Sequence, residues 1–278
     1  MLLVTGATGN VGRQVVAQLL AAGTPVRALT RRPDGAGLPA GVEVVAGDLT
    51  EPDTLPAALS GVKAAFLFPV PGSGPAFAAA ARAAGVARIV VLSSAEIVDG
   101  AAHQANRVAE FHAEIERAVE GSGVPWTFLR CAAFATNTLQ WAGMIRAGDT
   151  VSAPYPQASF APVHEADVAA VVARVLTADG HAGARYRVTG PAALTQAEQV
   201  AVIGAALGRR LRFVEVPPEL ARERMLRRLP APIVDGLLDI FAAATTRPAE
   251  VLPTVEEVTG RPARTYAEWA ADHRKDFQ

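Results

Sequence analysis

The sequence is poor in the residues that crosslink a chain, bind metals or span a membrane. Its one cysteine, Cys131, excludes a disulfide within the chain and is typical of a reducing compartment. Histidines and cysteines do not occur at the spacing of a metal site, and no apolar stretch approaches the roughly 18 residues of a membrane-spanning helix. The chain also opens inside its first strand, without a signal peptide. We therefore expect a cytoplasmic protein without a metal.

An excess of charge of one sign is also missing. The 26 basic and 27 acidic residues give a formal net charge of −1, which argues against a nucleic-acid-binding protein. Half of the 278 residues are hydrophobic, enough to bury a large core. These properties indicate a globular protein whose partner is a small molecule, and they leave its oligomeric state open.

Glycine is plentiful, and three glycines near the start of the chain are spaced three residues apart. A strand-like stretch at residues 2–4 precedes them, and a helical apolar pattern follows. In such a unit the first glycine makes the turn, the second lets the backbone approach a pyrophosphate, and the third lets the helix pack on the sheet. The second could also need a φ that branched residues avoid. We predict a dinucleotide-binding turn of Gly6, Thr8, Gly9, Asn10, Val11, Gly12 and Arg13; the alternative is a strand-turn-helix unit without a ligand.

The residues after the second strand indicate which dinucleotide binds. Residues 26–30 have a strand pattern, and Arg31 and Arg32 follow where an NAD site would place Asp or Glu on the ribose 2′-hydroxyl. A guanidinium favours the 2′-phosphate of NADP, through a charge-assisted hydrogen bond worth roughly 1.5–3 kcal/mol. The alternative is that arginine is merely the common cation here, since the chain has 24 arginines and two lysines. We predict NADP(H), with Arg13 as a second contact.

Strand-like and helix-like stretches alternate through the first half of the chain. Strands are expected at residues 42–46, 64–68, 88–92 and 126–130, and helices at 53–59, 75–84 and 105–120. This alternation predicts an α/β fold with a Rossmann-type doubly wound parallel sheet, whose strands all end at one edge. That edge would carry the glycine turn, Arg31, Asp48, Leu49, Phe68, Ser93 and the loop after Arg130.

The second half is less regular. A helix is expected from His164 to about residue 176, strands at 186–189 and 211–216, and further helices after Leu194 and near 266–273. We interpret residues 1–130 as an NAD(P)-binding domain. Residues 131–278 are interpreted as a smaller C-terminal α/β substrate lobe that is partly interleaved with the first domain.

Several motifs together resemble one known family. Thr-Gly-Ala-Thr-Gly-Asn-Val-Gly at residues 5–12, Gly-Asp-Leu at 47–49, Ser-Ser at 93–94 and Val-Thr-Gly-Pro at 188–191 are similar to the NmrA-like, atypical branch of the short-chain dehydrogenase/reductase superfamily. The resemblance implies an NAD(P)-binding Rossmann fold. It also implies that Phe134 and Asn137 form a loop beside the nicotinamide. It leaves the reaction open, because this branch includes quinone reductases, azo reductases and redox-sensing regulators.

The tyrosine and lysine that catalyse in ordinary short-chain dehydrogenases are missing. There the lysine, four residues after the tyrosine, lowers the pKa of the phenol so that it can pass a proton to a carbonyl. Alignment of the helix after the fifth strand places Val108 and His112 at these positions. This excludes a ketone reductase that uses the pair, but not the reduction of a quinone or an activated enone.

His112, Ser93 and Ser94 are the catalytic candidates. His112 shares a helix face with Val108 and Ile115, where it could hold the nicotinamide ribose or donate a proton with a pKa near neutrality. The alternative is a histidine bonded to a backbone carbonyl. The two serines would contact a cofactor or substrate hydroxyl at the strand end, or else cap a turn.

His164 and Asp167 are a further candidate pair, and the sequence leaves two functions open. His164 and Asp167 could form an acid–base pair, but we rather expect Asp167 to offset the dipole at a helix start, and the family resemblance implies that His164 lines the cleft. We predict an NADPH-dependent oxidoreductase that transfers hydride to a conjugated quinone-, azo- or enone-like small molecule, which could be aromatic. The alternative is a non-catalytic NADP(H) sensor that changes conformation or partner with cofactor occupancy.

Overall fold

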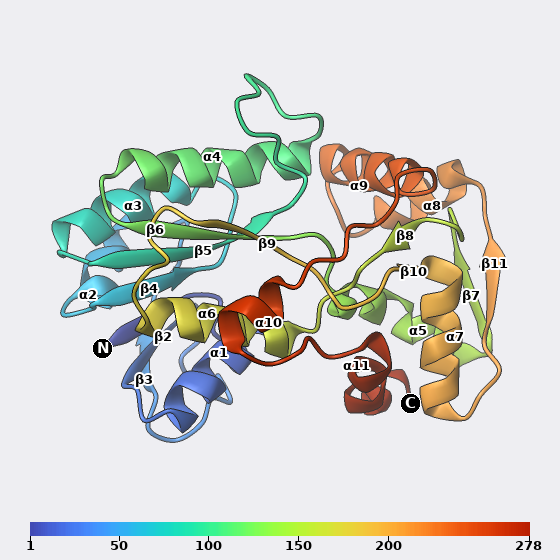
Figure 1. The fold of residues 1–278 in the computed structure, drawn as a ribbon, viewed down its shortest axis with the longest axis horizontal. Coiled ribbons are helices and arrows are strands. Elements are labelled where there is room, and N and C mark those ends of the chain that lie inside the picture. The colour runs from blue at the N-terminus through green and yellow to red at the C-terminus, as the bar shows by residue number, and fades with distance from the viewer.

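A seven-stranded parallel sheet forms the centre of the protein in a computed structural model that describes all 278 residues (Figure 1). The strands lie in the order β3-β2-β1-β4-β5-β6-β9, and every neighbouring pair is parallel. They are β1 (Leu2–Val4), β2 (Val26–Thr30), β3 (Glu43–Ala46), β4 (Ala64–Leu67), β5 (Arg88–Ser94), β6 (Trp126–Cys131) and β9 (Arg185–Val188). The doubly wound α/β sheet expected from the sequence is confirmed.

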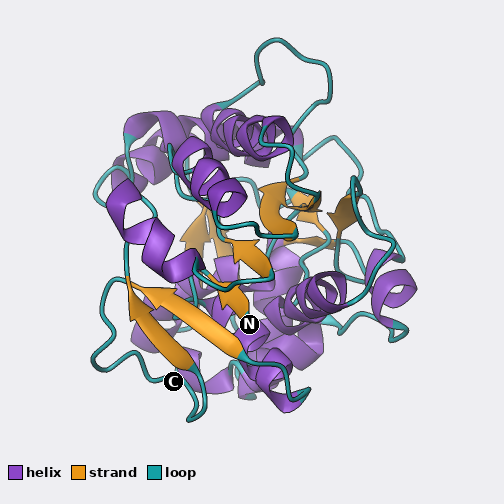
Figure 2. Cartoon of the chain, turned by 90° about the vertical axis from the view of Figure 1, so that its left-hand side faces the viewer, coloured by secondary structure: helices purple, strands orange, loops and turns teal.

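Helices cover both faces of this sheet (Figure 2). Residues of β5 alternate between two cores: Val90 and Leu92 lie under α1 and α6, whereas Ile89 and Val91 lie under α2, α3 and α4. Because both faces are buried there, β1 and β4 are wholly apolar and β5 is apolar from Ile89 to Leu92, as is typical of parallel sheets, whereas the edge strands β3 and β9 carry exposed charged residues. The helices are α1 (Asn10–Ala21), α2 (Leu55–Leu59), α3 (Gly74–Ala83), α4 (Arg107–Gly121) and α6 (Glu165–Thr177).

A smaller lobe continues from the carboxyl end of β6, on the right in Figure 1. It has its own core, in which Trp141, Ile203 and Trp269 are buried. Two two-stranded sheets, β7 with β11 and β8 with β10, support it. Its elements are α5 (Ala142–Ala147), β7 (Thr150–Ala153), β8 (Ser159–Phe160), β10 (Leu194–Thr195), α7 (Gln196–Leu207), β11 (Arg212–Glu215), α8 (Pro218–Met225), α9 (Ala231–Ala243) and α11 (Tyr266–Asp272).

Some segments that follow residue 131 pack with the central sheet rather than in the smaller lobe. α6 and β9 follow residue 131, yet they complete the central sheet and its helical cover, and α10 (Thr254–Thr259) packs on α6. The expected strand at 88–92 is longer than the pattern indicates, because β5 continues to Ser94. Both serines therefore belong to the strand end. No helix is long and apolar enough to cross a membrane.

Candidate active site

The turn between β1 and α1 uses its three glycines in three different ways. Gly6 has a φ of +59°, and a Cβ there would lie 2.8 Å from the ring of Phe68. A Cβ on Gly12 would lie 2.1 Å from the carbonyl oxygen of Gly6, so this glycine lets α1 pack close to the turn, as expected. Gly9 has a φ of −83°, which branched residues adopt readily, so the expectation of a special backbone angle there is wrong.

At the N-terminus of α1, several backbone amides donate to no acceptor in the protein. Gly9 is the N-cap and provides no side-chain cap, and the first turn carries no acidic residue. The amides of Thr8, Asn10, Val11 and Gly12 donate to no acceptor within the protein, and Arg13 is the first to bond back, to the carbonyl of Gly9. Free amides combined with a helix dipole fit a pyrophosphate. These residues therefore suit the dinucleotide that the sequence predicts.

The side chain of Arg13 hydrogen-bonds to the backbone of the glycine turn and of a neighbouring loop. Its Nε donates to the carbonyl of Thr8 at 2.8 Å, and its two terminal nitrogens donate to the carbonyls of Gly37 and Ala36 at 2.8 and 2.9 Å. The side chain thus links the glycine turn to the loop that follows Arg31 and Arg32. Its guanidinium is largely committed to these carbonyls, which makes it a support of the site.

Arg31 and Arg32 are exposed at the carboxyl end of β2 and form no ion pair. Asp48, after β3, is bonded to the amide and hydroxyl of Thr50 at 2.9 and 2.8 Å. The bond from the Thr50 amide, its hydroxyl and, more weakly, Arg31 hold the pKa of Asp48 below its usual value. Leu49 is buried. The two guanidiniums are therefore exposed at the carboxyl end of β2, without an acidic partner in the protein.

Phe68 lies at the end of β4 and remains partly exposed. Thr5 fixes the backbone beside it: its hydroxyl donates to the carbonyl of Phe66 at 3.0 Å and accepts from the amide of Phe68 at 2.7 Å. The ring of Phe68 packs against Gly6. Sequence analysis did not identify Thr5, whose role depends on strands 61 residues apart in the chain.

Ser93 and Ser94 point to opposite faces of the sheet and have different partners. The hydroxyl of Ser93 donates to Glu116 on α4 at 2.5 Å, and the side chain is buried. Ser94 instead accepts the amide of Glu96 at 3.2 Å, and its own proton has no protein acceptor. Of the two, only Ser94 has a hydroxyl proton free for a ligand.

Glu116 and Arg130 form a buried ion pair beside Ser93. Arg130, in β6, binds Glu116 through its Nε at 3.0 Å and a terminal nitrogen at 2.6 Å. Its outer nitrogens bind Asp99 at 3.0 and 2.7 Å, and these two acids outweigh burial to raise the pKa of Arg130. Sequence analysis missed this cluster, although an arginine in an apolar strand was a visible signal.

His112 lies one turn before Glu116, on the face of α4 that turns toward the sheet. Its neighbours on this face, Ala109 and Glu116, are buried, and His112 is half-buried. Nδ1 lies 2.7 Å from the carbonyl oxygen of Val108. Since a carbonyl only accepts, Nδ1 carries the proton and Nε2 of the neutral ring is an acceptor. Burial lowers the pKa of His112, which keeps the ring neutral at pH 7.

The loop after β6 holds the remaining expected cofactor contacts. Phe134 is half-buried, and its backbone forms a parallel bridge with Val163. Asn137 is exposed, and its amide donates to the carbonyl of Phe134 at 3.0 Å. Cys131, at the start of this loop, is fully enclosed, and burial raises the pKa of its thiol. The loop thus leaves the sheet at the same edge as Ser94.

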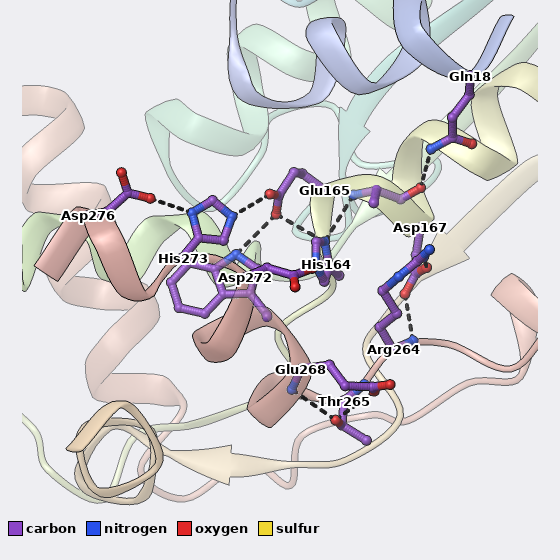
Figure 3. A network of polar contacts seen from close by, with 12 residues as sticks. Gln18, His164, Glu165, Asp167, Arg264, Thr265, Glu268, Asp272, His273 and Asp276 are labelled. Atoms are coloured by element: carbon purple, nitrogen blue, oxygen red, sulfur yellow. Dashed lines mark hydrogen bonds and ion pairs between the residues drawn. The ribbon is translucent and has the colours of Figure 1, made fainter. Parts of the chain in front are cut away.

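His164 and Asp167 belong to a network that ties the C-terminal segment to α6 (Figure 3). His164 caps α6 by accepting the amide of Ala166 at 3.1 Å, and its other nitrogen lies 3.4 Å from Asp272. Asp167 accepts the amide of Arg264 at 2.7 Å and also binds its guanidinium. The two residues therefore have separate partners and do not form an acid–base pair. Asp167 does lie in the first turn of the helix, as expected.

Glu165 is the centre of this network. It accepts from His273 at 2.6 Å and from the indole nitrogen of Trp269 at 3.1 Å. Burial would raise its pKa, but the neighbouring imidazoles of His164 and His273 outweigh this and lower the pKa to about 2. No group of three His, Cys, Asp or Glu side chains in the protein could hold a metal ion. The network is therefore a set of ion pairs within the fold.

Comparisons with known proteins confirm the resemblance that the motifs indicate. Residues 1–261 match the model of the NmrA-like family. The (4-alkanoyl-5-oxo-2,5-dihydrofuran-3-yl)methyl phosphate reductase of Streptomyces griseus subsp. griseus is 44% identical over 282 residues, which cover 100% of this chain and 99% of that protein. The NAD(P)H azoreductase of Xenophilus azovorans is 38% identical over 288 residues, with the same two coverages. A crystal structure of an NADPH-dependent quinone oxidoreductase from Escherichia coli matches with a TM-score of 0.80 and 26% identity, over 98% of this chain and 99% of that one.

Proposed function

Because the chain belongs to the NmrA-like family, we propose that it is an NADPH-dependent reductase of a conjugated small molecule. The observation that carries the cofactor assignment is the N-terminus of α1, where the amides of Thr8, Asn10, Val11 and Gly12 lack protein acceptors. These amides would hold the pyrophosphate. Arg31 and Arg32, exposed and without ion pairs after β2, would bind the 2′-phosphate and favour NADPH over NADH.

The side chains that we expect near the nicotinamide, Ser94 and His112, can orient ligands, but neither of them is a strong acid. When bound, NADPH supplies a hydride to the acceptor. Ser94 can donate its hydroxyl proton to an acceptor oxygen or to the carboxamide of the cofactor. His112 can accept a ribose hydroxyl through Nε2, because Nδ1 is committed to Val108 and burial lowers the pKa of the ring. His112 is therefore better suited to hold the ribose than to donate a proton.

This arrangement selects the class of acceptor. Without the tyrosine and lysine pair, an isolated ketone would gain negative charge on oxygen with no acid to neutralise it. A quinone, an azo group or an enone delocalises that charge and takes its proton from water. Three relatives carry names of this kind: a quinone oxidoreductase, an azoreductase and a reductase of an unsaturated lactone with a phosphate ester. We infer that the acceptor is a conjugated molecule of this type.

The test is NADPH oxidation by the purified protein with a panel of quinones, azo dyes and unsaturated lactones, with identification of the reduced product. The proposal expects turnover with at least one class. His112→Ala should lower that turnover by roughly 10- to 100-fold through lost positioning. His112→Asn, which can still offer an oxygen acceptor, should be less damaging. Tight NADPH binding with no acceptor reduced would refute the reductase and favour the sensor.

A further inference from the structure

The buried ion pair of Glu116 and Arg130 is contacted by a second carboxylate, that of Asp99, which is not needed to neutralise the arginine. The Glu116 and Arg130 side chains are 5% and 6% exposed, and their shortest contact is 2.6 Å. A buried arginine requires one paired carboxylate, because an unpaired charge in the interior is costly. Asp99 adds two more hydrogen bonds to the same guanidinium, yet its own side chain is 65% exposed. The contact between Arg130 and Asp99 therefore serves to hold Asp99 in place rather than to neutralise the arginine.

What Asp99 holds is the loop between β5 and α4, residues 95–106. The loop begins directly after Ser94 and ends at Asn106, which caps α4. In Figure 1 it projects beyond α4, next to the smaller lobe. Within the loop, Gln104 bonds the backbone of Val98 in both directions, and its own amide donates to Glu110 of α4 at 2.8 Å. Without outside contacts, such a loop would be free to move away from the sheet.

Arginines from three distant elements bind this loop. Arg130 in β6 binds Asp99, Arg247 after α9 lies 3.3 Å from Glu96, and Arg185 in β9 lies 3.8 Å from Asp99. Only the contact of Arg130 is bidentate, and its guanidinium is already fixed from below by Glu116. A preoriented bidentate arginine orders its partner better than a flexible surface pair does. Arg130 is therefore the main anchor of the loop.

The loop lies beside the residues proposed to act on the ligands. Ser94, its neighbour in sequence, accepts the loop amide of Glu96, and His112 lies in the second turn of the helix that the loop leads into. We propose that Arg130 is a positioning residue for the acceptor: through Asp99 it fixes the start of the 95–106 loop, and with it the strand end at Ser94 and the start of the helix that carries His112. This inference rests on the proposed reductase function.

The experiment compares Asp99→Ala with Asp179→Ala. Asp179 also pairs an arginine, Arg88, at 2.8 Å, but it lies at the opposite edge of the sheet, beside the first residue of β5. In Asp99→Ala the inner pair stays intact, so the fold and NADPH affinity should be preserved. The KM for the acceptor should rise about tenfold, equivalent to one lost charge-assisted hydrogen bond, with a smaller change in kcat. Asp179→Ala should match the wild type in both constants.

Hydrogen exchange provides a reading that does not depend on turnover. Peptides covering residues 95–106 should exchange faster in Asp99→Ala than in the wild type or Asp179→Ala, and Asp99→Glu should restore part of the protection and of the KM. Unchanged exchange in the loop overturns the anchoring role, whatever the activity. Faster exchange with an unchanged acceptor KM overturns the positioning role. A wild type that reduces no acceptor overturns the proposed function, which the exchange data alone do not.

Discussion

α1 and α6 pack side by side on the same face of the sheet, and their N-termini are completed in opposite ways. Gln18 of α1 donates to the carbonyl of Ala166 in α6 at 2.9 Å, which links the two helices (Figure 3). α6 begins with a histidine cap, two acids in its first turn and partners from the C-terminal segment. α1 begins with glycine, no acid and several unfilled amides.

We interpret the capped N-terminus of α6 as structural and the uncapped N-terminus of α1 as the proposed binding site. Every helix leaves its first amides without an internal acceptor, and a folded protein fills them with side chains, water or a ligand. Thr195 and Thr265 fill those of α7 and α11 with complete capping boxes, and Asn106 caps α4. Six further helices, α2, α3, α5, α8, α9 and α10, also lack a side-chain cap, so a bare end alone does not mark a site. The end of α1 differs because it follows the glycine turn at the carboxyl end of β1, where we propose that the pyrophosphate binds.

The largest expected effect comes from blocking the α1 end. Gly9→Val should reduce NADPH affinity at least about 100-fold, because a branched side chain would occupy the place of the pyrophosphate and cost two charge-assisted bonds of roughly 1.5–3 kcal/mol each. The fold should survive, because the φ of −83° suits valine and a Cβ would lie 3.3 Å from its nearest neighbour, the Gly6 oxygen. Calorimetric titration and thermal melting measure both. Wild-type affinity in the folded variant would disprove the phosphate site.

The matched control is Gly12→Ala, three residues along. Its Cβ would lie 2.1 Å from the Gly6 oxygen, so the turn itself must move. Overpacking of this kind costs typically about 1–3 kcal/mol, and the Tm should fall by roughly 2–12 °C. Gly9→Val should melt closer to the wild type than Gly12→Ala does. The reverse order would show that Gly9 serves the fold rather than the ligand.

A smaller effect is expected from the charge that selects the cofactor. Arg31→Ala should weaken NADPH binding about tenfold and leave NADH binding unchanged, since only NADPH carries the 2′-phosphate. Arg261→Ala is a suitable control, because Arg261 is also an exposed arginine without an ion pair and lies in the C-terminal segment. Calorimetric titration with both cofactors checks the result. Equal losses for NADPH and NADH would contradict the assignment.

An acid placed at the α1 end should have opposite effects on stability and binding. Asn10→Asp imitates the acidic first turn of α6, so the ligand-free protein should gain about 0.3–1 kcal/mol from the helix dipole. The same charge would repel the pyrophosphate, and NADPH affinity should fall by roughly fivefold. Melting without ligand and calorimetric titration separate the two. Tighter NADPH binding would contradict the account.

The smallest effect concerns the filled end of α6 and its pH dependence. Both nitrogens of His273 face carboxylates at 2.6 Å, and the bond to Glu165 is the main cause of its raised pKa. A raised histidine pKa stabilises the fold below the unfolded value of about 6.5, and this stability is lost as pH rises through the folded pKa. Glu165, with a pKa of about 2, stays ionised throughout. The Tm should therefore fall by a few degrees as pH rises above about 6.5 through the raised pKa of His273. His273→Gln should remove most of this slope without changing NADPH affinity; an equal slope in the variant would contradict the assignment.

The sequence predicted the local units well. The order of strands and helices followed from apolar periodicity because both faces of the parallel sheet are buried. The packing role of Gly12 also depends only on nearby residues, and the structure confirms it. The same holds for the position of the glycine turn. These features are encoded within a dozen residues of chain.

Features that join distant segments could not be predicted. Glu116 and Arg130 are 14 residues apart, and Asp99 and Arg130 are 31 apart, so no spacing rule connects them. The two small sheets include strands of only two residues, too short for a periodic pattern. His112 was placed on the correct helix face, but the proton on Nδ1 follows from the contact with Val108, which only the folded helix shows.

The most direct test of the contrast between α1 and α6 is hydrogen exchange at their N-termini with and without NADPH. The amides of Thr8, Asn10, Val11 and Gly12 have no protein acceptor, so they should exchange rapidly in the free protein and become protected when the pyrophosphate binds. Peptides covering residues 163–168, in which the amides of Ala166, Asp167 and Val168 already donate to His164, should not change. Protection confined to the start of α1 is the predicted result. Saturating NADPH that leaves residues 8–12 unprotected would contradict the account.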